Sequence, residues 1–224
     1  MKRIFNVQRN VSDSIFKIDG VGIDLERFQP CKDEQEKIKQ RLILGFDEKD
    51  FIITVVAELN KNKNQIALVQ LVQRLQKEIP YLKVLLIGKE TESTVRDYVD
   101  SHNLNNIVVF LGYRNDVEKI LSVSDIGFSS SLREGLPINI IESMACGLPV
   151  ICSDNRGHRS LINHLETGFI FQHNDENKIG EFILLLYKNS SLRKEIGKRN
   201  VVAAQQFSLN KILPCMEVIY KKLM

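Results

Sequence analysis

DIGFSSSLREGLPINIIESMACGLPVICS, residues Asp125–Ser153, carries the clearest structural pattern of this 224-residue sequence. It predicts a strand over Asp125–Ser130, a polar turn, an amphipathic helix and a second strand over Pro149–Ser153. Pro137 has a fixed φ and no N–H, so it suits the first helical turn, while Gly147 supplies the C-terminal stop. A strand, a helix and a second strand in this order are typical of a parallel sheet.

Two carboxylates lie near the start of the predicted helix. Glu134 precedes it, where free backbone N–H groups and the positive end of the helix dipole converge, and Glu142 lies further inside it. Helical spacing predicts an apolar arc of Ile138, Ile141, Met144 and Ala145, opposite Asn139, Glu142 and Ser143. The two carboxylates could flank an anion pocket. The alternative is that Glu134 is only a favourable dipole partner and that Glu142 is simply solvated.

Further strands and helices alternate along the chain. Apolar runs predict strands at 51–57, 82–87, 107–111 and 168–171, and apolar residues at helical spacing predict helices at 33–44, 66–79, 91–102, 117–123, 177–187, 191–207 and 209–224. Strands alternating with helices predict an α/β fold with a doubly wound, Rossmann-like parallel sheet and right-handed crossovers.

Residues 131–162, SLREGLPINIIESMACGLPVICSDNRGHRSLI, resemble a known family signature. The family is that of the retaining, nucleotide-sugar-dependent glycosyltransferases of family 4 (group 1), which have the GT-B fold. In that family a Glu, seven residues and a second Glu span the turn and the helix, as Glu134 and Glu142 do here. The resemblance is closest to bacterial capsular and exopolysaccharide members, and it runs from about Gly20 to the C-terminus.

The resemblance also implies a domain organisation. Gly20–Pro30, GVGIDLERFQP, is similar to the family segment that joins an N-terminal acceptor-binding domain to a C-terminal donor-binding domain. Residues 1–30 are therefore expected to be an interdomain linker remnant, and residues 31–207 the donor-binding domain. Residues 208–224 are expected to form a helix that crosses back to the missing N-terminal domain. The chain would then be the donor-binding half of an enzyme.

The loop Glu58–Gln65, ELNKNKNQ, should face the ligand, because doubly wound sheets bind ligands beyond the C-terminal ends of their strands. By resemblance Lys63 would hold the sugar diphosphate and offset the charge that develops on it during transfer. Glu58 stands where the family usually has an Arg, and Asn64 replaces a Gly. The alternative for Lys63 is a surface lysine that binds no phosphate.

Other loops would complete the donor site. Gly88 would let the ligand approach the backbone, and Gly112, Tyr113 and Arg114 are similar to the segment whose backbone meets the base; alternatively, Tyr113 covers the core edge. The resemblance implies ribose binding by Glu142, contact of Glu134 with the sugar ring, and backbone N–H groups of Gly135 and Leu136 near the distal phosphate and sugar. Pro137 is also among the implied donor-binding residues. Lys63 and Glu134 are the implied catalytic residues. His158 and Arg159 either face the cleft or are ordinary surface residues.

Composition and charge limit the other possibilities. Hydrophobic residues make up 43% and charged residues 26% of the chain, and the net charge of +3 is too small to indicate nucleic-acid binding. Lys188–Met224 has eight Lys or Arg and two Glu, so this basic tail could touch the inner face of the membrane, or be only a solvated helix face. No signal peptide, membrane span or CxxC pair occurs, so a cytoplasmic protein with reduced thiols is expected.

Together these observations predict a glycosyltransferase of polysaccharide biosynthesis. It would transfer a sugar, with retention, from a nucleotide-diphosphate sugar, for which UDP is the expected nucleotide, to a glycan or lipid-linked acceptor. No cofactor and no metal are expected, because Lys63 and the helix N-terminus replace the metal and no Asp-x-Asp occurs. The chain alone is expected to be inactive. The alternatives are a non-catalytic nucleotide-sugar-binding module and, less favoured by the motif, a nucleotide-sugar epimerase or a pyridoxal-phosphate phosphorylase.

Overall fold

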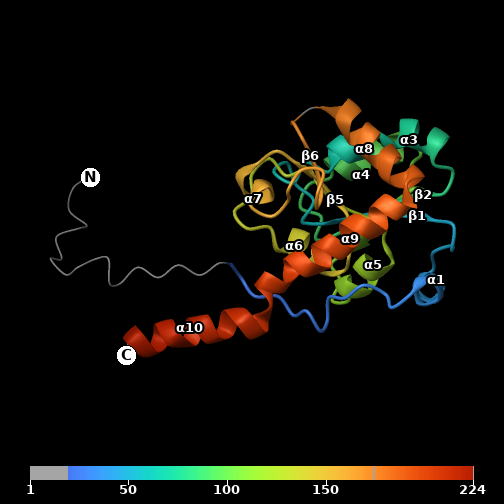
Figure 1. Cartoon of the computed structure of the whole chain (residues 1–224). Coiled ribbons are helices and arrows are strands. Elements are labelled where there is room, and N and C mark those ends of the chain that lie inside the picture. The colour runs from blue at the N-terminus through green and yellow to red at the C-terminus, as the bar shows by residue number, and fades with distance from the viewer. Residues whose placement is uncertain (1–19, 174, 224) are drawn as a thin grey trace, which may run out of the picture.

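A computed structural model of the chain describes residues 20–173 and 175–223, so most of the predicted linker remnant lies outside the described residues. The fold is built on a six-stranded parallel sheet with the strand order β3-β2-β1-β4-β5-β6 (Figure 1). The strands are β1 (Phe51–Val56), β2 (Leu82–Ile87), β3 (Val108–Gly112), β4 (Ile126–Ser129), β5 (Val150–Ser153) and β6 (Gly168–Phe171). The α/β, doubly wound prediction is therefore confirmed.

The strand order reverses between β1 and β4. β1 pairs with β2 on one side and with β4 on the other, where Ile53 aligns with Ile126. The chain therefore winds outward in one direction from β1 and in the other direction from β4. Such a reversal leaves a crevice beyond the carboxyl ends of the two central strands, which is where ligands bind in this architecture.

Helices cover both faces of the sheet (Figure 1). Their bounds are α1 (Glu34–Ile43), α2 (Ile66–Val69), α3 (Val72–Glu78), α4 (Thr94–Ser101), α5 (Val117–Val123), α6 (Ile138–Ala145), α7 (Arg156–Arg159), α8 (Glu176–Lys188), α9 (Ser190–Ala204) and α10 (Leu209–Leu223), with a 3₁₀ turn at Gln205–Phe207. The predicted helix at 66–79 is thus two short helices. The sequence analysis did not predict α7.

Alternate residues of the central strands face opposite layers. In β1, Phe51, Ile53 and Val55 pack in the cluster that holds α2, α3, α4 and α8, whereas Ile52 packs with Ile120 of α5. Because both faces of the parallel sheet are covered, its strands are apolar at nearly every position. This double burial explains the continuous run FIITVV in β1.

The structure corrects the predicted faces of α6. Ile138, expected on the apolar arc, is 39% exposed, and Ser143, expected on the polar side, is buried. The side-chain oxygen of Ser143 would lie 2.9 Å from a Cβ placed on Gly127 of β4, so this contact admits only small residues. The side-chain amide of Asn139 donates a 2.9 Å hydrogen bond to the carbonyl of Val56. Two polar residues therefore face the sheet, where shape and hydrogen bonding outweigh hydrophobicity.

The start of the described chain packs against the 3₁₀ turn that precedes α10. Ile23 and Phe28 are buried, and the N–H of Ile23 donates to the carbonyl of Phe207 at 2.8 Å. The helix α10 then extends away from the body of the domain (Figure 1), with Leu213 and Tyr220 exposed. Among the described residues, no helix combines the length and the apolar character needed to cross a bilayer.

Candidate functional site

The loops that follow β1 and β4 meet at the reversal of strand order. The hydroxyl of Ser130, directly after β4, donates to the carbonyls of Lys63 and Asn64 at 3.0 and 2.7 Å. The N–H of Leu132 donates to the carbonyl of Asn62 at 2.7 Å. The two loops are therefore joined by several hydrogen bonds, so the side chains that they carry are held at fixed positions above the crevice.

Asn64 has a left-handed backbone, with φ of 52°. The family resemblance implies a Gly at this position, and asparagine is one of the few other residues that adopt this conformation readily. The left-handed residue ends the turn Asn60–Asn64 and lets α2 begin two residues later. The replacement of Gly by Asn therefore preserves the loop that presents Lys63.

Lys63 and Glu134, the two predicted catalytic residues, form an ion pair. The Lys63 Nζ lies 2.6 Å from the Glu134 Oε1, and the two side chains are 25% and 12% exposed. One residue comes from the loop after β1 and the other from the loop after β4, so the pair lies at the reversal of strand order. An ammonium group in this position can bind a diphosphate, and the carboxylate can accept hydrogen bonds from hydroxyl groups.

The turn before α6 has free hydrogen-bond donors. Within the described residues, the N–H groups of Gly135 and Leu136 donate to no protein acceptor, and no side chain caps α6. Pro137 is the N-cap residue of α6, with φ of −76°. Free N–H groups at a helix N-terminus attract anions, and the phosphate subsite expected at this turn stays a prediction. Gly157 of α7 packs closely against this turn, because a Cβ added to Gly157 would lie 2.7 Å from the Cβ of Glu134.

Glu142, the predicted ribose ligand, lies in different surroundings from Glu134. It is partly buried near the ion pair of Arg27 with Glu118, whose Nη2 and Oε2 are 2.7 Å apart. Burial raises the pKa of Glu142 to about 7, Arg27 opposes this rise, and Glu118 adds to it. Glu142 is therefore a carboxyl group that gains or loses its proton near neutral pH.

Gly88 and Gly112 border a second hollow of the same sheet edge, a cavity of about 300 Å³ that Glu90, Arg96 and Phe110 also line. Gly88 has a φ of 149°, and a Cβ there would lie 2.0 Å from the carbonyl oxygen of Ala57. Only glycine fits at position 88, because a larger residue would overlap the backbone at the end of β1. The sequence analysis had considered only the approach of a ligand.

The cavity has a charged wall that the sequence analysis did not predict. Arg96 forms a bidentate contact with Glu90 at 2.6–2.9 Å, and its guanidinium carbon lies 4.0 Å from the centre of the Phe110 ring. The sequence did not predict this pair, because Glu90 and Arg96 are six residues apart, which is not the spacing of neighbours on a helix. Glu90 lies in the loop before α4, and Arg96 lies in the first turn of α4. A planar guanidinium flanked by an aromatic ring is suited to stacking on a flat heterocycle.

The other predicted residues of these loops are near the surface. Tyr113 is 79% exposed, so it does not cover the core edge. Arg114 forms an ion pair with Asp116 at 2.7 Å, and both are about one third exposed. Glu58, which stands in the place of the usual Arg, is exposed, and its backbone carbonyl accepts a 2.8 Å hydrogen bond from Gln65.

His158 is fully buried, which the surface alternative of the sequence analysis did not anticipate. Its Nδ1 lies 2.7 Å from the carbonyl of Ser153, and its backbone N–H donates to the Asn155 side chain at 3.0 Å. Burial lowers the pKa of His158, so the ring is neutral at pH 7, with Nδ1–H donating to Ser153. Its Nε2 is buried and unpaired within the described residues. Arg159, by contrast, is at the surface, paired with Asp154.

The six-stranded parallel sheet with helices on both faces is the fold of one half of the GT-B type glycosyltransferases. The family model for glycosyl transferases group 1 matches residues 36–201, and the chain belongs to this family. A glycosyltransferase named EpsD from Bacillus subtilis is 34% identical over 210 residues, which are 93% of this chain and 55% of that protein. An Escherichia coli galactosyltransferase that uses UDP-Gal and a GlcNAc-diphosphoundecaprenol acceptor is 32% identical over 69% of this chain and 40% of its own length.

Solved structures share the fold. A glycosyltransferase from Rickettsia africae has a TM-score of 0.80 at 23% identity, over 90% of this chain and 55% of that one. Anabaena HepE, in complex with UDP and glucose, has a TM-score of 0.77 at 21% identity, over the same shares of the two chains. The C-terminal domain of a Francisella tularensis group 1 glycosyl transferase is covered in full, with a TM-score of 0.72. The chain spans about half the length of the curated relatives that it matches.

Proposed function

We propose that this chain is the donor-binding half of a retaining glycosyltransferase that uses a UDP-sugar and acts in bacterial polysaccharide biosynthesis, with a glycan or lipid-linked acceptor. The observation that carries the proposal is the ion pair of Lys63 with Glu134 at the reversal of strand order. Two relatives support the nucleotide and the acceptor, because one solved neighbour holds UDP and one curated relative uses a diphosphoundecaprenol acceptor.

The ion pair suggests how a donor would engage the crevice. A diphosphate that binds Lys63 and the free N–H groups of Gly135 and Leu136 would displace Glu134 from the lysine. The released carboxylate could then accept hydrogen bonds from hydroxyl groups of the sugar. Lys63 would stabilise the negative charge that grows on the diphosphate as the glycosidic bond breaks. In this proposal no metal and no cofactor are needed, and Glu142 holds the ribose hydroxyls.

The proposal assigns only part of an active site to this chain. The acceptor would be bound by the N-terminal domain that the related proteins have, so the chain alone would bind the donor weakly and transfer little or no sugar. The cytoplasm is the proposed location, with contact of the basic C-terminal region at the inner membrane face. A non-catalytic nucleotide-sugar-binding module is the second candidate, because Glu58 stands where the family resemblance implies an Arg that holds the diphosphate.

Calorimetry of the chain with UDP, GDP, ADP and UDP-glucose tests the site. We expect UDP and UDP-glucose to bind, and Lys63→Ala and Glu142→Ala each to weaken binding by tenfold or more, about 1.4 kcal/mol. Lys61→Ala is the matched control, because Lys61 is an exposed lysine of the same loop. Equal affinity of all the variants would remove both residues from the site. Sugar transfer after the N-terminal half of a relative is added would exclude the non-catalytic candidate.

A further inference from the structure

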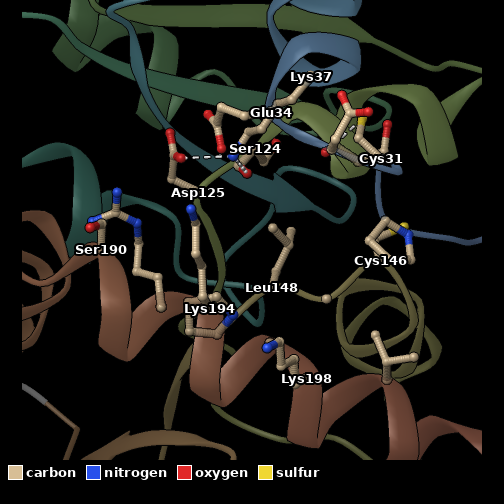
Figure 2. A pocket seen from close by; sticks show the side chains of 18 of the residues that line it. Cys31, Glu34, Lys37, Ser124, Asp125, Cys146, Leu148, Ser190, Lys194 and Lys198 are labelled. Carbon is tan, nitrogen blue, oxygen red and sulfur yellow. Dashed lines mark hydrogen bonds and ion pairs between the residues drawn. The ribbon is translucent and has the colours of Figure 1, made fainter.

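A second cavity, of about 560 Å³, is drawn from close by in Figure 2. Its walls come from the residues that start α1, from α9, and from the residues that precede β4 and β5, such as Asp125 and Pro149. In a parallel sheet all amino ends lie at one edge, so this cavity is separate from the loops that carry Lys63 and Glu134. Its volume is in the range of small-molecule sites.

Five basic side chains line this cavity. They are Lys32, Lys37, Arg193, Lys194 and Lys198. Lys194 and Lys198 are one turn apart on α9, and Figure 2 shows Lys194 extending from the helix toward the segment that carries Asp125. In the part of the chain that the structure describes, neither Lys194 nor Lys198 has a carboxylate within ion-pair distance. Two unpaired ammonium groups therefore share one wall.

The carboxylates of the cavity are largely engaged elsewhere. Asp125 binds Lys37 at 2.9 Å and Arg41 at 2.7 Å, and it also accepts the N–H of Ile52. Asp33 accepts the N–H of Glu36 and so caps α1. Among the lining carboxylates only Glu34 lacks such a partner within the described residues, and it is exposed. The lining thus holds five cationic and three acidic side chains, and within the described residues none of the three carboxylates pairs with Lys194 or Lys198.

Backbone groups add to the positive potential. The first residue of α9, Ser190, lines the cavity, and its N-cap residue Asn189 makes no capping hydrogen bond to the helix. Since α9 has 15 residues, its first-turn N–H groups carry the positive end of a long helix dipole. The remaining wall is apolar and includes Pro30, Leu148 and Val201. The cavity thus combines a cationic side with an apolar side.

We propose that this cavity binds a phosphate-bearing ligand, with the phosphate held by Lys194 and Lys198 and the rest of the ligand against the apolar wall. Charge-assisted hydrogen bonds from ammonium groups are among the stronger contacts available to a phosphate. The same chemistry fits a phosphorylated small molecule and the headgroup of an anionic lipid, and both sources enter the test below. The proposal does not depend on what occupies the donor crevice.

Calorimetry with inorganic pyrophosphate tests the proposal in the Lys63→Ala background, where the donor crevice is disabled. We expect binding in that background, and at least tenfold weaker binding when Lys194→Ser and Lys198→Ser are added. Both lysines are exposed, so their replacement should not unfold the domain. The matched control is Lys178→Ser with Lys211→Ser, two exposed helical lysines outside the cavity, and it should change the affinity by less than about twofold.

Sedimentation with vesicles separates the two sources. The wild type and the same two double variants are each sedimented with phosphatidic acid vesicles and with phosphatidylcholine vesicles. Pelleting with phosphatidic acid alone, lost in the Lys194/Lys198 variant, would identify a lipid headgroup. Pyrophosphate binding that this variant loses, without pelleting, would identify a soluble phosphate. The proposal is overturned if the protein with intact Lys194 and Lys198 binds neither pyrophosphate nor phosphatidic acid vesicles. It is also overturned if the two double variants bind these ligands equally.

Discussion

The two edges of the sheet hold the same kind of ion pair in opposite settings. At the amino edge, Asp125 and Arg41 are 8% and 6% exposed, with Arg41 Nη2 and Asp125 Oδ2 2.7 Å apart. At the carboxyl edge, Glu134 and Lys63 are 12% and 25% exposed, at 2.6 Å. The distances hardly differ. The two pairs differ in how many other hydrogen-bond partners their side chains have and in how far the side chains are exposed to solvent.

Those partners separate a pair that is locked into the core from a pair that a ligand could displace. Arg41 also donates to the carbonyls of Val123 and Asp50, and Asp125 also accepts from Lys37 and Ile52. Neither Arg41 nor Asp125 can leave without stranding several buried groups. In contrast, Lys63 and Glu134 have no other side-chain partner within the described residues, so an incoming anion can replace the carboxylate at little cost.

Asp125→Ala should have the largest effect, because it strands the buried guanidinium of Arg41 and the N–H of Ile52. We expect a loss of about 3–5 kcal/mol in the free energy of unfolding, measured by urea denaturation. Asp116→Ala is the matched control: its pair with Arg114 is about one third exposed, and its loss should cost less than about 1 kcal/mol. Equal losses would show that burial does not distinguish the two pairs.

Glu142→Gln should change how stability depends on pH. The folded protein holds the Glu142 proton up to about pH 7, whereas the unfolded carboxyl has its ordinary pKa of 4.5. The stabilisation from this proton is complete below about pH 4.5 and is lost as the pH rises through 7. Above that pH the variant should therefore be more stable than the wild type by about 1–2 kcal/mol, after screening by solvent.

Urea unfolding across this pH range measures the difference. Glu166→Gln, at an exposed position, should follow the wild-type profile. Parallel profiles for the wild type and Glu142→Gln would show that Glu142 titrates normally.

Glu134→Gln should separate binding from chemistry at the carboxyl edge. The amide no longer competes with phosphate for Lys63, so UDP without a sugar should bind about three- to tenfold more tightly, measured by calorimetry. Lys63→Ala should do the opposite. Weaker UDP binding by both variants would mean that the ion pair is needed intact and is not displaced by the ligand.

Asn64→Ala should have the smallest effect, because only the backbone conformation is disturbed. Alanine is strained at a φ of 52°, so the loop should lose about 1 kcal/mol of stability. Asn64→Gly should keep or slightly raise it. Thermal unfolding of the two variants gives the comparison, and an alanine variant as stable as the glycine variant would contradict the argument.

The sequence predicted the elements better than the orientation of their side chains. All six strands were predicted, four of them from apolar runs, because strands buried on both faces contain few polar residues. On α6 the buried positions of Ile141, Met144 and Ala145 were predicted correctly, but Ile138 and Ser143 were not, since helical spacing cannot show that Ser143 must fit against Gly127. The short helix α7 was missed because its four residues, RGHR, have no apolar period.

At the candidate site, too, the positions of residues along the chain were predicted, but their contacts were not. The motif located Lys63 and Glu134 on the right loops, but their direct contact depends on strand order, which the sequence analysis did not assign. The pair of Glu90 with Arg96 and the buried ring of His158 depend on tertiary packing that leaves no local signal.

Gly88 has a consequence for how the carboxyl edge of the sheet can evolve. Its hydrogen atoms face the Ala57 carbonyl so closely that even a methyl group would overlap the backbone of β1. The ends of β1 and β2 can therefore stay paired only while this residue remains glycine. A lineage in which it changed would have to splay the two strands and move the loop of Lys63, so drift at this one position is coupled to the geometry of the whole pocket.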